Sequence, residues 1–242
     1  MSSWEPASGP GPAARRAAMK RRIRAYFDAQ HVLEVDTPML SPYAVSDPQI
    51  ESLEIAKSQV SDRPLYLHTS PEFCMKRLIA AEYPDIYSIC RVFRDGESGR
   101  LHQPEFTMLE WYRLGMGLDE IIADTVGVIH AALDREIDVD YADYRDAFVS
   151  ACGLDPLDTP VEALAEAAGA DVALLAAVGD ERDDWLDLLL STRVAAGFEP
   201  SRLTVLRHYP ASQAALARLC PADAAVADRF EVFLGSVELA NG

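Results

Sequence analysis

The segment Pro104–Arg113 interleaves charged, phenolic and apolar residues. If it is a β-strand, alternate side chains share a face, because the side-chain period of a strand is two. One face would then carry Phe106, Met108, Glu110 and Tyr112. A carboxylate and a phenol among apolar residues could form a pocket for an ammonium group. The alternative is that Glu110 simply pairs with a neighbouring arginine or lysine, and alternation alone leaves both interpretations open.

Cationic side chains cluster around the hairpin that precedes this segment. Arg94 ends the preceding strand, and the loop opposite it holds Arg100 and His102. Such a group suits a phosphate chain, since the planar guanidinium offers bidentate donors. Arginines that are merely solvated at a hairpin end would leave the same pattern.

Two glutamates in the last predicted hairpin could hold a metal ion. If Gly235-Ser236 form a two-residue type II′ turn, Phe233 pairs with Glu238. Glu231 then lies on the same face as Glu238, diagonally displaced by about 7–8 Å. Two carboxylates so placed repel unless a cation lies between them, and oxygen-only ligation suits Mg²⁺ that bridges to phosphates. Two exposed edge-strand glutamates are the alternative.

These residues need a scaffold, and hydrophobic periodicity predicts an alternation of helices and strands. Strands are predicted at 32–35, 65–68, 87–94, 104–113, 203–208, 229–234 and 237–240. Helices are predicted at 13–30, 73–81, 118–133 and across about 144–198. Ser70 is the expected N-cap of the second helix, with Pro71 at its first position, and Thr159–Glu162 reads as a capping box. The order of elements predicts an α/β (α+β) fold with an antiparallel sheet.

Composition limits the class of protein. Of the 242 residues 49% are hydrophobic and 25% charged, which is typical of a globular chain. No apolar run reaches the ~18 residues that a transmembrane helix needs. The four cysteines include no close pair, which excludes a zinc ribbon and a thioredoxin-like motif and indicates reduced thiols in the cytoplasm. They are Cys74, Cys90, Cys152 and Cys220.

The net charge of −17 argues against extensive nucleic-acid binding, since proteins that grip phosphates normally present a basic face. Six of the 22 basic residues nevertheless crowd one segment: Arg15, Arg16, Lys20, Arg21, Arg22 and Arg24. We interpret them as the solvated face of an amphipathic helix, with a dock for an acidic partner or an RNA end as the alternative. Residues 1–12, rich in Ser, Gly and Pro, are predicted to be a flexible leader and not a signal peptide.

Longer runs of sequence resemble motifs of one enzyme family. Val32–Leu40 is similar to the first motif of the class II aminoacyl-tRNA synthetases, a helix–strand–proline element at the dimer interface. Arg91–Arg94 together with His102–Tyr112 is similar to the second motif of the lysine-specific subgroup. The match covers essentially the whole chain. It implies a class II synthetase-type antiparallel sheet flanked by helices, with residues 13–242 as the catalytic domain and about 144–198 as a helical insertion.

The resemblance also implies a role for individual residues. Arg94 would hold the α-phosphate and the aminoacyl carbonyl, and so stabilise charge in the transition state. Phe106 would stack on adenine. Further contacts to ATP would come from Asp95, Gly96, His102, Gln103, Glu238 and Leu239. Lysine would be bound by Ser70, Glu72, Glu110, Tyr112 and Asn241. Glu231 and Glu238 would carry Mg²⁺.

Within the family, the chain resembles the truncated paralogues that modify translation elongation factor P. Pro210–Ala217 and Glu110–Arg113 carry this likeness, and the anticodon-binding domain of a lysyl-tRNA synthetase is not expected before residue 13. The resemblance implies a cytoplasmic homodimer that activates lysine or (R)-β-lysine with ATP and transfers it to a lysine side chain of elongation factor P. The expected acceptor is therefore not tRNA. A tRNA-charging fragment, or an inactive paralogue that binds lysine or ATP, is the alternative.

Some positions depart from the family pattern. Position 96 is Gly where many relatives have a Glu that recognises the adenine amino group, and the adjacent Glu97 is the candidate substitute; Gln103 replaces the more usual Asn. The sequence ends at Asn241-Gly242, before the Phe-x-Glu-Leu continuation and the third class motif with its ATP-clamping arginine. We therefore expect either a C-terminally incomplete chain or a degenerate paralogue.

Overall fold

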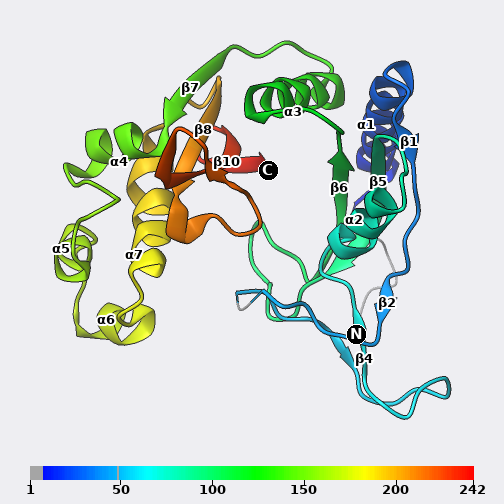
Figure 1. Ribbon diagram of the computed structural model, residues 1–242, viewed down its shortest axis with the longest axis horizontal. Coiled ribbons are helices and arrows are strands. Elements are labelled where there is room, and N and C mark those ends of the chain that lie inside the picture. Colours follow the sequence, from blue (N-terminus) through cyan, green and yellow to red (C-terminus); the bar gives the residue numbers. More distant parts are fainter. Residues whose placement is uncertain (1–7, 48) are drawn as a thin grey trace. The chain divides into compact units, whose positions relative to one another are not determined.

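A two-stranded antiparallel hairpin, β5 (Ile86–Phe93) and β6 (Glu105–Tyr112), lies at the centre of the first of two compact units. The computed structural model describes residues 8–47 and 49–242 (Figure 1). The first unit extends to Gly115 and the second begins at Met116.

Two helices cover opposite faces of the β5–β6 hairpin. On one face, α1 (Pro10–Ala29) buries Phe27, whose ring stacks on Tyr87 with centroids 4.4 Å apart and lies 5.8 Å from Trp111. On the other face, α2 (Glu72–Ala80) buries Met75 in a cluster that includes Ile86 and Tyr112. The predicted pocket face of β6 is therefore the face on which α2 packs.

Short strands complete the first unit. β1 (Leu33–Glu34) pairs in parallel with β5, and a separate sheet has the order β2 (Leu40–Ser41), β4 (Leu65–Leu67), β3 (Glu54–Ile55). The two sheets are joined where the N–H of Phe93 donates to the carbonyl of His68 at 3.0 Å.

The second unit is a mixed sheet. Its central strands β8 (Leu203–Pro210) and β10 (Asp223–Leu234) are antiparallel, with β11 (Val237–Asn241) and the short β9 (Leu219–Cys220) both paired to β10. α3 (Leu118–Leu133) packs Ile122, Val126 and Ile129 on this sheet. The carboxylate of Glu120 accepts the N–H of Gly117 at 2.7 Å and so caps the start of α3.

A helical segment follows β7 (Val139–Asp143), the edge strand of this sheet that pairs with β8. It consists of α4 (Tyr144–Cys152), α5 (Val161–Ala167), α6 (Val172–Val178) and α7 (Arg182–Leu189), and it ends in a π-helical turn (Leu190–Val194) and a 3-10 turn (Ala195–Gly197). Trp185, Tyr144 and Phe148 are fully buried in its core. A further 3-10 turn, Ala211–Gln213, lies between β8 and β9. The prediction of helices across about 144–198 is confirmed.

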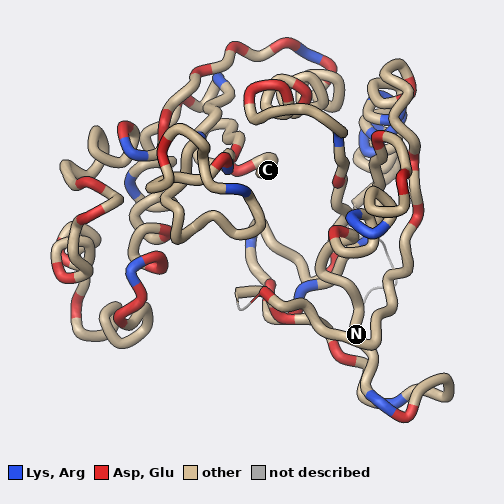
Figure 2. Tube along the Cα trace, viewed as in Figure 1, with Lys and Arg blue, Asp and Glu red and all other residues tan. Residues whose placement is uncertain are grey.

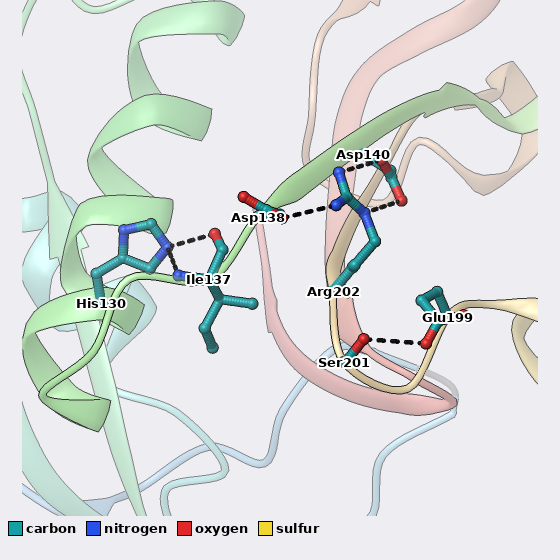
Figure 3. Close-up of polar contacts among 7 residues, drawn as sticks. All are labelled: His130, Ile137, Asp138, Asp140, Glu199, Ser201 and Arg202. Carbon is teal, nitrogen blue, oxygen red and sulfur yellow. Dashed lines mark hydrogen bonds and ion pairs between the residues drawn. The ribbon is translucent and has the colours of Figure 1, made fainter.

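The outermost strand, β7 (Val139–Asp143), is parallel to β8 and was missed by sequence analysis. Few of its residues are apolar, and an ion-pair cluster holds its start (Figure 3). The guanidinium of Arg202 donates to both carboxylate oxygens of Asp140 at 2.7 and 2.8 Å and to Asp138 at 2.9 Å. These partners are about 60 residues apart along the chain, which local periodicity cannot detect.

Other sequence predictions needed correction at their ends. α1 begins at Pro10, so the leader prediction is wrong for residues 10–12, where proline fits the first helical turn; residues 1–7 lie outside the described part of the chain. The N-cap of α2 is Pro71 and not Ser70. The capping box at 159–162 does not form: Pro160 is the N-cap of α5, and the backbone of Thr159 instead bonds Asp155 and Arg182. β10 begins at Asp223, earlier than predicted, and β2, β3 and β9 were also missed.

The basic residues of the N-terminal segment lie along α1 (Figure 2). Arg24 forms a bidentate ion pair with Glu34, which also accepts the hydroxyl of Tyr87 at 2.9 Å. No helix in the described ranges combines the length and the hydropathy needed to span a bilayer.

Candidate active site

The register of the β5–β6 hairpin fixes which side chains share the α2-facing side. Residues directly opposite in the ladder point to the same face, and here Ile86 pairs with Tyr112, Ser88 with Glu110, and Val92 with Phe106. The hydroxyl of Tyr112 donates to Oε1 of Glu110 at 2.8 Å. The alternation predicted for this strand is confirmed.

The carboxyl group of Glu110 lies in an environment that disfavours its charge. Burial is the main reason that its pKa is raised to about 7, and the nearby Glu72 raises it further. The hydrogen bond from Tyr112 and the charges of Lys76 and Arg94 act in the opposite direction. Burial also raises the pKa of the Tyr112 phenol, so it stays a hydrogen-bond donor. Among the described residues, the two cations that act on Glu110 form ion pairs with other acids, Lys76 with Glu72 and Arg94 with Glu97, which favours the pocket interpretation over a structural ion pair.

Glu72 is the first residue of α2, and its negative charge acts on the carboxyl group of Glu110. Its Oε1 is 2.6 Å from Nζ of Lys76, one turn later on the exposed side of the helix. Ser70 stays close to this end, because the N–H of Glu72 donates to its hydroxyl at 3.4 Å. Sequence analysis missed Lys76, although its (i, i+4) spacing from Glu72 was a usable signal.

Arg94 lies immediately after β5, with its guanidinium 5.3 Å from the ring centroid of Phe106. It also approaches the carbonyl of Thr69 and Oε1 of Glu97, each at 3.5 Å. Half-buried and only weakly bonded, this guanidinium could bind an anion next to an aromatic platform.

The loop after Arg94 is more exposed. Gly96 has a φ of 76°, a left-handed conformation that disfavours Glu or any other residue with a Cβ, and its N–H donates to Asp95. Gln103 donates to the carbonyl of Gly99 at 3.4 Å, and His102 accepts the Gly99 N–H at 3.0 Å through its own carbonyl. The side chain of Glu97 is engaged with Arg94, and its predicted role towards adenine stays a prediction.

A second group of predicted residues lies on the terminal hairpin of the second unit. The φ of Gly235 is 56°, as a type II′ turn requires at its first central position, and the predicted pairing of Phe233 with Glu238 is confirmed. Beyond this pair the register shifts, so that Val232 faces Ala240. Leu239 is thus the extra residue of a β-bulge that the sequence analysis did not include.

The charge of Glu238 acts on the carboxyl group of Glu231. Burial raises the pKa of Glu231 to about 7, and the charge of Glu238 adds to this effect. Arg229, a residue missed by sequence analysis, donates to Oε1 of Glu231 at 2.8 Å. Glu238 is exposed and accepts a hydrogen bond from Asn241 at 2.9 Å. Two neighbouring carboxylates with oxygen-only donors fit a divalent cation such as Mg²⁺, although Arg229 already offsets part of the charge of Glu231.

Comparison with known proteins identifies the family. Residues 13–242 match the family described as tRNA synthetases class II (D, K and N). The chain belongs to this family. Its α/β fold and the ligase class of its enzyme activity, predicted from sequence, are thereby confirmed: this class II synthetase-family chain is an ATP-dependent ligase.

Curated relatives match this class II chain over its full length. Proteins named elongation factor P--(R)-beta-lysine ligase are 38% identical in Vibrio atlanticus (strain LGP32) and 39% identical in Edwardsiella ictaluri (strain 93-146). The one from Photorhabdus laumondii subsp. laumondii is 38% identical. The alignments cover 100% of this chain and 75–76% of each relative.

Replacing Glu110 with Gln should stabilise the protein at pH 8. The folded-state pKa of about 7 lies above the ordinary value of 4.5 for a glutamate side chain, so the ionised carboxylate destabilises the fold. This cost is absent below about pH 4.5 and complete above about pH 7, where it amounts to at most about 3 kcal/mol. Urea unfolding at pH 5 and pH 8 measures it. Glu105→Gln, at an exposed position on the other face of β6, should change little at either pH. Equal stability of wild type and Glu110→Gln at pH 8 would contradict the buried-carboxylate assignment.

Proposed function

We propose that this chain activates lysine or (R)-β-lysine with ATP as an aminoacyl-adenylate and transfers it to a lysine side chain of translation elongation factor P. The observation that carries the proposal is the grouping of Glu72, Glu110 and Tyr112 with Arg94 around one face of β6. The names of the relatives, 38–39% identical over the full chain, support the same acceptor and amino acid.

The carboxylates would bind the amino groups of the substrate. The ionised form of Glu110 would be stabilised most by an incoming ammonium group. The cation would offset both the desolvation of the Glu110 carboxylate and its repulsion from Glu72. Tyr112 orients the carboxylate through its hydrogen bond. Ser70, next to Glu72, and Asn241 on β11 are proposed as further contacts to the amino acid.

Arg94 would hold the reacting phosphate. A carboxylate oxygen of lysine attacks the α-phosphorus of ATP, a phosphorus–oxygen bond breaks, and pyrophosphate leaves with the electron pair. The guanidinium stabilises the negative charge that develops on the phosphoryl oxygens. Phe106, against which Arg94 lies, offers a face for adenine, and Asp95, Gly96, His102 and Gln103 would line the nucleotide. Glu238 and Leu239 are the proposed nucleotide contacts of β11.

The second step forms an amide. The uncharged ε-amine of the acceptor lysine attacks the acyl carbonyl carbon, AMP leaves, and the amine loses its proton. Arg94, proposed to contact the same carbonyl, would stabilise the tetrahedral oxyanion. A net charge of −17 is unfavourable for binding tRNA, which supports a protein acceptor.

Glu231 and Glu238 would hold Mg²⁺. When bound, the ion would neutralise phosphate charge and orient the pyrophosphate leaving group. Because the pKa of Glu231 is raised to about 7, the ionised fraction of this carboxyl group rises as the pH passes through about 7, and a bound cation would favour the ionised form.

We also propose that the chain is a homodimer. The region that resembles the first class motif exposes several large apolar side chains: Leu33, Met39 and Leu40, each 44% exposed. Water-exposed apolar groups close together in sequence are typical of surfaces that bind another chain.

The adenylation proposal is tested by pyrophosphate exchange and acceptor labelling. ATP–pyrophosphate exchange should depend on lysine or (R)-β-lysine, supplied separately, and labelled amino acid should move to elongation factor P. Arg94→Ala should lower the exchange rate at least 100-fold, because its contact strengthens in the transition state. Arg63→Ala, at an exposed loop position, is the matched control. Label on tRNA and not on protein would contradict the proposed acceptor. Binding of both substrates without exchange would indicate an inactive paralogue.

Glu110→Gln should separate the two substrate sites. Removing the charge while keeping an oxygen should weaken lysine binding by about 10- to 100-fold, the range for a charged hydrogen bond. ATP binding should stay within twofold. Calorimetry measures both affinities, and Phe106→Leu should give the reverse pattern.

The wild-type affinity for lysine should also rise as the pH increases through about 7, because only ionised Glu110 pairs with an ammonium. This pH dependence should flatten in Glu110→Gln. An equal loss of lysine and ATP binding would contradict the pocket assignment.

The homodimer should sediment at twice the mass of the 26.6 kDa chain. Leu40→Asp should weaken association, because it places a charge on an apolar contact. Val172→Asp, at an equally apolar but 84% exposed position of the other unit, should not. Sedimentation of the wild type as a monomer at micromolar concentration would contradict the proposal.

A further inference from the structure

Three potential metal ligands converge in the second unit, apart from the glutamate pair on the terminal hairpin. A ring nitrogen of His208, the sulfur of Cys220 and a carboxylate oxygen of Asp228 all lie within 4.8 Å of one another. All three residues are half-buried, and the thiol of Cys220 is free. No role in the proposed ligase reaction uses them.

Irregularities of the sheet bring these side chains together. His208 has a φ of 58°, a left-handed conformation that is uncommon for a residue with a side chain. The β8–β10 ladder shifts register between Ala227 and Phe230, so Asp228 lies in the irregular stretch. Cys220 reaches the same place on β9, because the N–H of Asp228 donates to the carbonyl of Arg218 at 2.8 Å. Backbone strain of this kind often marks functional positions.

One ring nitrogen of His208 is held by a carboxylate. Its Nδ1 lies 2.8 Å from Oδ1 of Asp143, which also accepts Nε of Arg207 at 3.0 Å. In metal sites, a carboxylate that bonds one ring nitrogen of a histidine orients the imidazole, and the other nitrogen binds the metal. The arrangement carboxylate–imidazole–metal is common around zinc.

The chemistry of the donors selects the ion. One thiolate, one imidazole and one carboxylate suit Zn²⁺ and other thiophilic divalent ions, and they do not suit Mg²⁺ or Ca²⁺, which prefer oxygen. Ligands of a tetrahedral zinc ion lie roughly 3.5 Å apart, so the side chains must close slightly on binding. Arg218 donates to Oδ2 of Asp228 at 2.8 Å, but its side chain is 68% exposed and the carboxylate has a second oxygen.

We propose that His208, Cys220 and Asp228 form a zinc-type metal site, with Asp143 positioning the imidazole. The three ligands come from β8, β9 and β10, so the ion would tie the segment between β8 and β10 back onto the sheet. With three protein ligands, the fourth position of a tetrahedral ion is open to water. The site is independent of the ligase reaction.

Cobalt binding to the full chain tests this site, because a cobalt–thiolate bond gives a charge-transfer absorption band. After removal of metals with a chelator, Co²⁺ should bind with one equivalent producing this band, and Zn²⁺ should displace it. Cys220→Ser should abolish the band. Cys152→Ser, also a half-buried free thiol of the same unit, should keep it.

The other ligands give a second readout. His208→Ala should weaken Zn²⁺ binding at least tenfold, and Asp143→Asn should weaken it by about 10- to 100-fold, as is usual for a carboxylate behind a metal-bound histidine. Zn²⁺ should raise the melting temperature of the wild type and not that of Cys220→Ser. Absence of the thiolate band in the wild type, or its survival in Cys220→Ser, would overturn the proposal. Binding at Glu231 and Glu238 alone would give no thiolate band and would count as the same negative result.

Discussion

The free-energy cost of partly burying the Glu110 carboxylate governs the chemistry of the first unit. Glu110 is half-buried on the face of β6 on which α2 packs, where Met75 of the helix contacts Ile86 and Tyr112 of the sheet. The hydrogen bond from the Tyr112 hydroxyl replaces part of the hydration that the carboxylate loses. The rest of the lost hydration is not replaced, and this raises the pKa of Glu110 to about 7. A cation would supply the rest. The same packing that stabilises the unit thus places an acid of raised pKa where the proposed ammonium group would bind.

The second unit also contains a glutamate whose pKa is raised by burial and by a neighbouring carboxylate. Glu231 is buried on β10, and its pKa is about 7 because of burial and the neighbouring Glu238. Here an arginine of the same strand, Arg229, offsets part of the charge. Glu110 and Glu231 are therefore both acids whose ionisation is favoured by an incoming cation. We propose an ammonium group as the partner of the first, which has a phenol beside it, and a hydrated divalent ion as the partner of the second, which has an exposed carboxylate beside it.

In the first unit, Arg94 carries the charge opposite to that of Glu110. Its guanidinium is half-buried, lies over Phe106 and makes only long contacts with protein acceptors. A guanidinium with only weak hydrogen bonds next to an aromatic ring could bind a nucleotide phosphate at little cost, because few protein hydrogen bonds would have to break first. Positive φ at Gly96 gives a local reason for the glycine that departs from the family pattern.

The sequence by itself determined the strands of both hairpins, the shared face of Phe106, Glu110 and Tyr112, and the type II′ turn. These features depend on residues close together in the chain, where side-chain period and turn chemistry act directly. Family membership followed from motif order. Only the tertiary structure decided the strand β7 with its Arg202 ion pairs, the bulge at Leu239 and the raised pKa values. It also brought His208, Cys220 and Asp228 together, although the cysteine spacing had excluded familiar zinc motifs. Long-range pairing and burial join residues that no local pattern connects, and so they could not be read from the chain alone.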